Sequence, residues 1–283
     1  GIFGGTIHFS PQCVTSGLYA MVERDRFNVI PVSEQQLETA KQYLIEAAAE
    51  RFEQKAQPCN LELQNWFKKE KRRIILVPGC GILGGGFYPY FRRSRKRVSP
   101  HFRNNLALVY EVAHAAQKLD CMVVYKQHPN SLFELEKHKL PDNVILVGES
   151  NVAEIVKQVD LVVSLGTKVA CTALVHGTPV LMAGEFTLKG TGSCIDYCPH
   201  TPFVDQLRKA LESGFTQKHK DAFEYYVARE LANVAFQFED GTIGRYGRSQ
   251  AEIPELLTSY LGLKGKPFSP SYHHPLFCAC ETC

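Results

Sequence analysis

Five short apolar runs lie between residues 74 and 184, and four of them are followed at once by a small, polar or glycine-rich stretch. Runs of this length, separated by segments with a helical period, indicate buried strands that alternate with helices. The pattern predicts an α/β fold with a parallel sheet that carries helices on both faces. The expected strands are residues 74–78, 122–125, 144–147, 161–163 and 180–183.

The other periodic segments predict mainly helices. Ser33 and Gln36 have the spacing of a capping box in front of a long helix at residues 34–52. Ser99 and Ser150 stand where N-caps of two further helices are expected, at 100–116 and 152–159. We also expect helices at 18–22, 132–138, 168–176, 201–213, 217–236 and 253–261, and strands at 6–9 and 28–31.

These elements divide the chain into four parts. Residues 1–73 form a lead-in of packed helices or part of a second region, 74–200 the sheet domain, 201–262 a set of C-terminal helices, and 263–283 a flexible tail. The chain starts at Gly1 without a methionine, which leaves open whether an N-terminal portion is missing.

Composition narrows the class of protein. With 283 residues, 45% of them apolar, the chain is long enough for a sizeable core. The net charge of +3 is too small for bulk nucleic-acid binding. Two basic runs, 68–73 and 92–97, flank a glycine stretch. These runs are expected to be either solvated surface or an electropositive surface that contacts a phosphorylated ligand, an anionic glycan or a membrane.

The ten cysteines do not indicate a disulfide framework, because the chain is large, α/β-patterned and shows no signal peptide. We therefore expect a cytoplasmic protein, with peripheral association on the inner face of the membrane as an alternative. No apolar run approaches the roughly 20 residues that cross a bilayer. The Cys and His residues at 194–200 and 273–283 lack the paired spacing of known zinc modules, so no metal site is predicted.

The polar stretches after four strands are expected at one edge, because parallel strands share the carboxyl-end edge where open α/β sheets bind ligands. Bare N–H groups, a lysine, a histidine and hydroxyls there suit a phosphate-bearing ligand. For the glycines we expect either a loop that binds phosphate or the acceptor, or a mobile loop. For the lysine and histidine we expect either an anion site or an ordinary turn at the end of a strand. The residues concerned are Gly79, Gly81, Gly84, Gly85, Gly86, Lys126, His128, Pro129, Ser164, Gly166, Thr167, Gly184 and Glu185.

Residues 160–184 resemble the donor half of GT-B glycosyltransferases, where a hydroxyl-led helix and a following small-Ala-Leu-x-x-Gly-x-Pro-Val turn hold the nucleotide sugar. With His128-Pro129 about 35 residues before Ser164, the chain resembles more narrowly the bacterial capsule-polysaccharide synthesis family, which includes β-Kdo transferases. The resemblance covers about residues 74–196. It implies a GT-B-like nucleotide-sugar-binding half with helical additions, and a partial acceptor-side region in the lead-in.

The resemblance also implies roles for single residues. His128, with Lys126 and Pro129, would meet the donor phosphate; Ser164, Gly166 and Thr167 would meet phosphate or ribose; Gly184 and Gly192 would shape the loop beside the sugar. Two positions depart from the family. Thr172 replaces a glutamate that contacts ribose, and the family's catalytic aspartate has no counterpart after residues 74–78. Glu185 and Asp196 are the reserve candidates for the general base.

The expected function is transfer of a sugar from a nucleotide donor to a capsular or related surface glycan, without a cofactor or metal. CMP-Kdo is the first donor to consider, and the acceptor is an anionic polysaccharide or a lipid-linked glycan, with a capsule-assembly complex as a possible setting. Two alternatives stay open. One is a non-catalytic glycan-binding or assembly protein that kept the fold; the other is a sugar-nucleotide epimerase.

Overall fold

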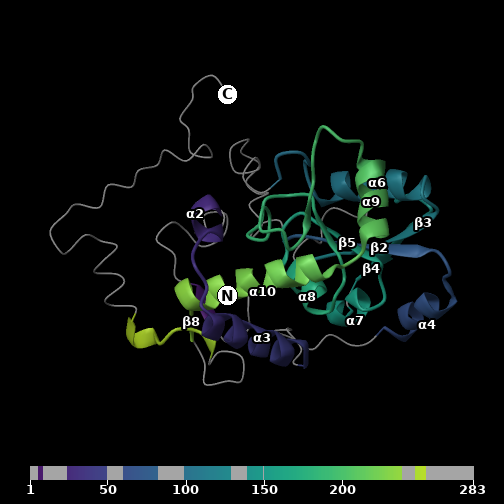
Figure 1. Ribbon diagram of the computed structural model, residues 1–283. Coiled ribbons are helices and arrows are strands. Elements are labelled where there is room, and N and C mark those ends of the chain that lie inside the picture. Colours follow the sequence, from purple (N-terminus) through teal and green to yellow (C-terminus); the bar gives the residue numbers. More distant parts are fainter. Residues whose placement is uncertain are drawn as a thin grey trace.

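A six-stranded, all-parallel sheet forms the centre of the molecule (Figure 1). The computed structural model describes residues 6–8, 24–49, 60–81, 99–128, 139–148, 150–237 and 246–252. Five strands occur where the sequence predicts them, and the sixth, β7, has only two residues, too few for a recognisable pattern. In spatial order the strands are β4 (Val144–Val147), β3 (Cys121–Lys126), β2 (Arg73–Pro78), β5 (Leu161–Ser164), β6 (Val180–Met182) and β7 (Ile195–Asp196).

Helices cover both faces of this sheet, as predicted. Along β2, Ile75 and Val77 point into a core formed with α6 (Asn105–Gln117) and α9 (Phe203–Ser213). Ile74 and Leu76 point the other way, into a second core. That core includes side chains of α3 (Glu34–Ala49), α7 (Val152–Val156), α8 (Lys168–Val175) and α10 (Gln217–Asn233). Strands β2, β3, β5 and β6 are buried on both faces, which explains their continuous apolar runs, whereas the edge strand β4 leaves Leu146 exposed.

Parts of the chain that are distant in sequence meet beside the sheet domain. Strand β1 (Thr6–His8) pairs antiparallel with β8 (Ala235–Gln237), which follows α10. Helix α3 packs along α10, and α2 (Arg24–Asn28) lies near one end of the pair in Figure 1. Helix α4 (Leu61–Lys69) leads into β2, and a short turn of 3₁₀ helix, Gln250–Glu252, ends the described chain.

Several local predictions need correction. The strand expected at 28–31 is absent, because α2 ends at Asn28 and the chain turns there. Helix α6 begins later than expected: Asn104 is its N-cap, and Ser99 instead closes a turn with Phe102. Helix α7 is capped by Asn151 rather than by Ser150. Serine and asparagine cap about equally well, so a pattern with both leaves the start ambiguous.

The capping box is confirmed. The Ser33 N–H donates to Gln36 Oε1 (2.9 Å) and the Gln36 N–H donates to Ser33 Oγ (3.2 Å) at the start of α3. The expected helices at 18–22, 132–138 and 253–261 and the tail at 263–283 lie outside the described residues. Among the described helices, none has the length and apolar character needed to cross a membrane.

Candidate functional site

The candidate site lies at the carboxyl edge of the sheet, where the order of the strands reverses. The chain runs from β2 to β3 and β4 on one side and then places β5 on the other side of β2. Open α/β sheets bind ligands in the crevice outside such a switch point. Leu76 of β2 lies level with Val162 of β5, so the segments after Pro78 and Ser164 reach this edge together. The sequence-predicted convergence of polar strand ends is therefore present.

Gly79, Gly81, Lys126 and His128 lie against one another at this edge. The Gly79 N–H donates to the Lys126 carbonyl (2.8 Å), and a Cβ on Gly79 would lie 3.0 Å from the His128 backbone nitrogen. A Cβ on Gly81 would lie 3.1 Å from Cε1 of the His128 ring. Both positions favour glycine because the loop after β2 packs directly on the histidine.

Lys126 and His128 give this edge two different kinds of donor. Lys126 is buried, and its Nζ donates to the Gly148 carbonyl (3.2 Å). His128 is half-buried, and its burial, followed by the nearby charge of Lys126, lowers its pKa. The imidazole is therefore neutral near pH 7. The pair offers a point charge and a neutral N–H donor, and both suit a phosphate oxygen.

Ser164, Gly166 and Thr167 form the turn from β5 into α8. Ser164 is fully buried, and its Oγ accepts hydrogen bonds from the N–H groups of Gly166 (3.1 Å) and Thr167 (3.2 Å). Thr167 is the N-cap of α8, where its Oγ1 accepts from the Val169 N–H (3.2 Å). Both hydroxyl oxygens thus hold the turn itself. They fix the start of α8, the positive end of its dipole, at the carboxyl edge.

Gly166 is a position where a side chain would be costly. Its φ of 133° is disfavoured for other residues, and a Cβ would lie 3.1 Å from the Glu185 carbonyl oxygen. We expect Gly166→Ala to lower the free energy of unfolding by about 2 kcal/mol, measured by urea denaturation. Gly148→Ala is the matched control, since nothing lies within 4 Å of its added Cβ. Equal stability of the two variants would contradict this role for Gly166.

Three further predicted residues lie in α8 and in the β6–β7 loop, residues 183–194. Thr172 is buried in α8, and its Oγ1 donates to the Lys168 carbonyl (3.4 Å). Gly184 is buried and lies two residues after the end of β6. Gly192 has a φ of 81°, and its Cβ would lie 3.7 Å from Ala222 of α10. The β6–β7 loop therefore extends from the sheet edge to α10.

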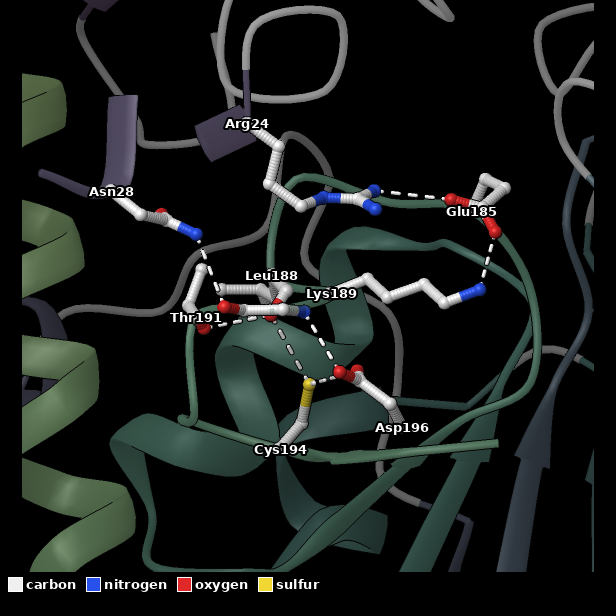
Figure 2. A network of polar contacts seen from close by, with 9 residues as sticks. Arg24, Asn28, Glu185, Leu188, Lys189, Thr191, Cys194 and Asp196 are labelled. Carbon is white, nitrogen blue, oxygen red and sulfur yellow. Dashed lines mark hydrogen bonds and ion pairs between the residues drawn. The ribbon is translucent and has the colours of Figure 1, made fainter. Parts of the chain in front are cut away.

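Glu185 anchors the β6–β7 loop through ion pairs (Figure 2). Its Oε2 accepts from Arg24 of α2 (3.0 Å), and its Oε1 accepts a very short hydrogen bond from Lys189. Asn28 of α2 donates to the Gly190 carbonyl of the same loop (3.1 Å). These contacts join α2 to a loop that is more than 150 residues away in sequence, so α2 helps to set the position of that loop.

The two reserve candidates for the general base differ in their surroundings. Burial by itself raises the pKa of Glu185, but the hydrogen bonds from Lys189 and Arg24 outweigh it and lower the pKa. Asp196 accepts a hydrogen bond from the Gly190 N–H (2.9 Å), and burial of its carboxyl group raises its pKa. Of the two carboxylates, Asp196 is therefore the stronger proton acceptor.

Some predicted features fall elsewhere. Pro129, Gly84, Gly85 and Gly86, with the basic run 92–97, lie outside the described residues. The other basic run, 68–73, ends α4 and begins β2, at the edge of the sheet opposite the candidate site. That run is exposed and does not border the site.

Sequence reasoning missed Arg24, Lys189 and His101 at this edge. Lys189 stands four residues after Glu185, a spacing that is informative only within a helix. Arg24 and His101 carry no sequence signal, because only the folded chain brings them to the β6–β7 loop.

The described residues contain no metal cluster, and the cavities they line lie elsewhere. No group of three or more His, Cys, Asp or Glu side chains there is arranged to hold a metal ion. Two surface cavities, of about 680 and 300 Å³, lie along α3 and α10 rather than at the carboxyl edge. The larger one is lined by the C-terminal end of α8, including His176.

No protein-family model matches the chain, and no curated protein sequence matches it significantly. Among solved structures, Thermosulfurimonas dismutans KpsC, β-Kdo 2,7 transferase, is 20% identical with a TM-score of 0.51, over 88% of this chain and 70% of that chain. KpsC, β-Kdo 2,4 transferase, of the same organism is 14% identical with a TM-score of 0.49, over 74% and 62%. The glycosyltransferase SnogD from Streptomyces nogalater is 21% identical with a TM-score of 0.37, over 67% and 44%.

At 20% identity the first of these matches shows a shared fold. It agrees with the parallel α/β sheet described above and confirms the expected GT-B-like fold. The other two are less similar, with TM-scores below 0.5.

Proposed function

We propose that the chain binds the phosphate of a nucleotide sugar at the carboxyl edge of the sheet and transfers the sugar to a glycan. One observation carries this proposal: Gly79, Gly81, Lys126 and His128 pack together at the switch point, beside the strand that leads into α8. An ammonium, a neutral imidazole and the start of a helix at one edge of the sheet are the groups that an anionic leaving group requires.

In the transfer step, the bond between the anomeric carbon and a phosphate oxygen breaks, and its electron pair leaves with the nucleotide. The growing negative charge would be stabilised by Lys126, by the N–H of His128 and by the positive end of the α8 dipole. Because Ser164 and Thr167 hold the turn before α8, the start of this helix is fixed before the donor binds. Its role is electrostatic and requires no reorganisation.

For the donor we propose CMP-Kdo, and for the acceptor a capsular or related surface glycan. Two lines support this choice. The His128-Pro129 and 160–184 segments resemble the capsule-polysaccharide synthesis family, and the fold is shared with a protein titled as a β-Kdo 2,7 transferase.

Nucleotide binding tests the proposal. Isothermal titration with CMP, UDP and GDP is expected to show binding of at least one nucleotide, and the Lys126→Ala variant is expected to weaken it, because a charge-assisted phosphate contact is lost. The matched control is Lys157→Ala, a lysine on the surface after α7. Failure of all three nucleotides to bind would overturn the proposal.

A second candidate function is supported by a specific observation. The described residues after β2, 79–81, carry no carboxylate, where the resembled family has its catalytic aspartate. A protein of this fold that binds a nucleotide sugar or glycan without catalysis would fit that difference. Release of nucleotide from the donor by the wild-type protein distinguishes the two functions.

A further inference from the structure

The transfer reaction needs a group that takes the proton of the acceptor hydroxyl, and this inference rests on the function proposed above. Neither reserve carboxylate is well placed for the task. Glu185 is held by Arg24 and Lys189, and an Asp196 oxygen accepts the Gly190 N–H. These contacts belong to the anchoring of the β6–β7 loop (Figure 2). The base is therefore expected to be another group at the carboxyl edge.

The turn in front of α6 brings a histidine to this edge. Ser99 is buried, and its Oγ donates to the Phe102 carbonyl (2.6 Å) and accepts from the Phe102 N–H (3.2 Å). At the end of the turn, the Asn105 amide bonds both the N–H (3.0 Å) and the carbonyl (2.9 Å) of Cys80. The backbone around His101 is therefore tied to the loop that follows β2, on the edge where the strand order reverses.

The His101 side chain faces the other loop of the site. The residue is exposed, and its ring contacts the ring of Tyr197, with centroids 5.3 Å apart. Tyr197 directly follows β7, and its N–H donates to the Met182 carbonyl of β6 (3.0 Å). His101 thus stands between the loop after β2 and the ends of β6 and β7. Among the described residues, none forms a hydrogen bond with its imidazole, and the residue is exposed.

We propose that His101 is the general base of the transfer reaction. An imidazole nitrogen takes the proton of the acceptor hydroxyl while the acceptor oxygen bonds to the anomeric carbon. The bond from that carbon to the donor phosphate breaks, and the electron pair leaves on the nucleotide. The imidazolium then returns its proton to water, and the base is restored.

The charged surroundings of His101 agree with this role. The pKa of His101 is lowered, mainly by partial burial and next by the charge of Lys189. Glu185 raises this pKa, and His200 makes a smaller contribution that lowers it. The lowered pKa leaves the imidazole neutral near pH 7, which is the form that accepts a proton. The groups involved come from the β6–β7 loop and from the turn before α9.

The test replaces His101 by glutamine and measures nucleotide release from CMP-Kdo, UDP-glucose and GDP-mannose, with water as the acceptor. We expect release from the donor that the wild type uses to fall about 100-fold in His101→Gln. Binding of the free nucleotide is expected to be unchanged, because the base does not touch the phosphate. His114→Gln, on an exposed position of α6, is the control and is expected to keep the wild-type rate.

The pH profile gives a second readout that a purely structural role would not move. Below its pKa the base is protonated, so the wild-type rate is expected to fall along an acidic limb, at a pH lower than that at which a histidine ordinarily titrates. Lys189→Gln removes a charge that lowers this pKa, so the limb is expected to move to higher pH. A limb that does not move would contradict the proposal.

Three outcomes would each overturn the assignment of His101 as the general base. These are a wild-type rate of nucleotide release in His101→Gln, loss of nucleotide binding in that variant, or abolition of release by Asp196→Asn alone. A wild-type protein that binds nucleotides but releases none from any donor would refute the proposed transferase function, and this inference with it. An active wild type with an active His101→Gln variant would refute the inference only.

Discussion

His128→Ala is expected to reduce nucleotide release from the donor by about 100-fold or more, because it removes a fixed N–H donor at the departing phosphate. The ring is held in place by Gly81 on one side and by its own half-buried position. The measurement is a single-turnover rate on the donor that the wild type uses. Loss of one preorganised donor changes the rate of bond breaking more than the affinity for the substrate.

The control for this variant is His176→Ala. His176 is also half-buried, and burial lowers its pKa as well, but it lies at the C-terminal end of α8, away from the carboxyl edge. Any general cost of removing a half-buried histidine appears in both variants. A similar loss of rate in the two would show that His128 has no special relation to the donor.

The second large effect concerns Glu230, which is fully buried on α10 and whose pKa is raised by burial to about 7. The Tyr226 hydroxyl donates to Glu230 Oε1 (2.9 Å) and lies 2.8 Å from Thr187 Oγ1 in the β6–β7 loop. The folded protein binds a proton at Glu230 between pH 4.5 and 7, where the unfolded chain has released it. Stability is therefore lost as the pH rises through this range, by roughly 3 kcal/mol.

Glu230→Gln removes this loss, because the amide is neutral at every pH. We expect urea denaturation to show the variant more stable than the wild type at pH 8, and little different at pH 5. Glu212→Gln, at an exposed position of α9, is the control and is expected to change stability little at either pH. A Glu230→Gln variant that is no more stable than the wild type at pH 8 would refute the protonated state of Glu230.

The sheet could be predicted because each strand is marked by the apolar character of its own short stretch of sequence. Strands that are buried on both faces are mainly apolar, and β2, β3, β5 and β6 carry that signature. The edge strand β4 is less buried but is also apolar in sequence. Parallel pairing alone determines the edge at which the polar stretches lie. The position of Lys126 and His128 could therefore be predicted from the sequence. The resemblance added the expectation of a phosphate ligand.

The loop between β6 and β7 was not predictable in the same way. Its anchors, Arg24 and Tyr226, come from helices at opposite ends of the sequence, and no short-range pattern links them to Glu185 or Thr187. Ser164 and Thr167 show a related limit. Their positions at the carboxyl edge were predicted. Their oxygen atoms, however, accept hydrogen bonds from backbone N–H groups of the turn itself, and residue type alone does not indicate this structural role.

The most direct test of the account is hydrogen–deuterium exchange with and without the nucleotide that binds most tightly. Added protection is expected at residues 79–81, 126–128 and 164–169, which meet at the carboxyl edge. Protection confined instead to residues 41–48 and 217–224, beside the larger cavity, would contradict it.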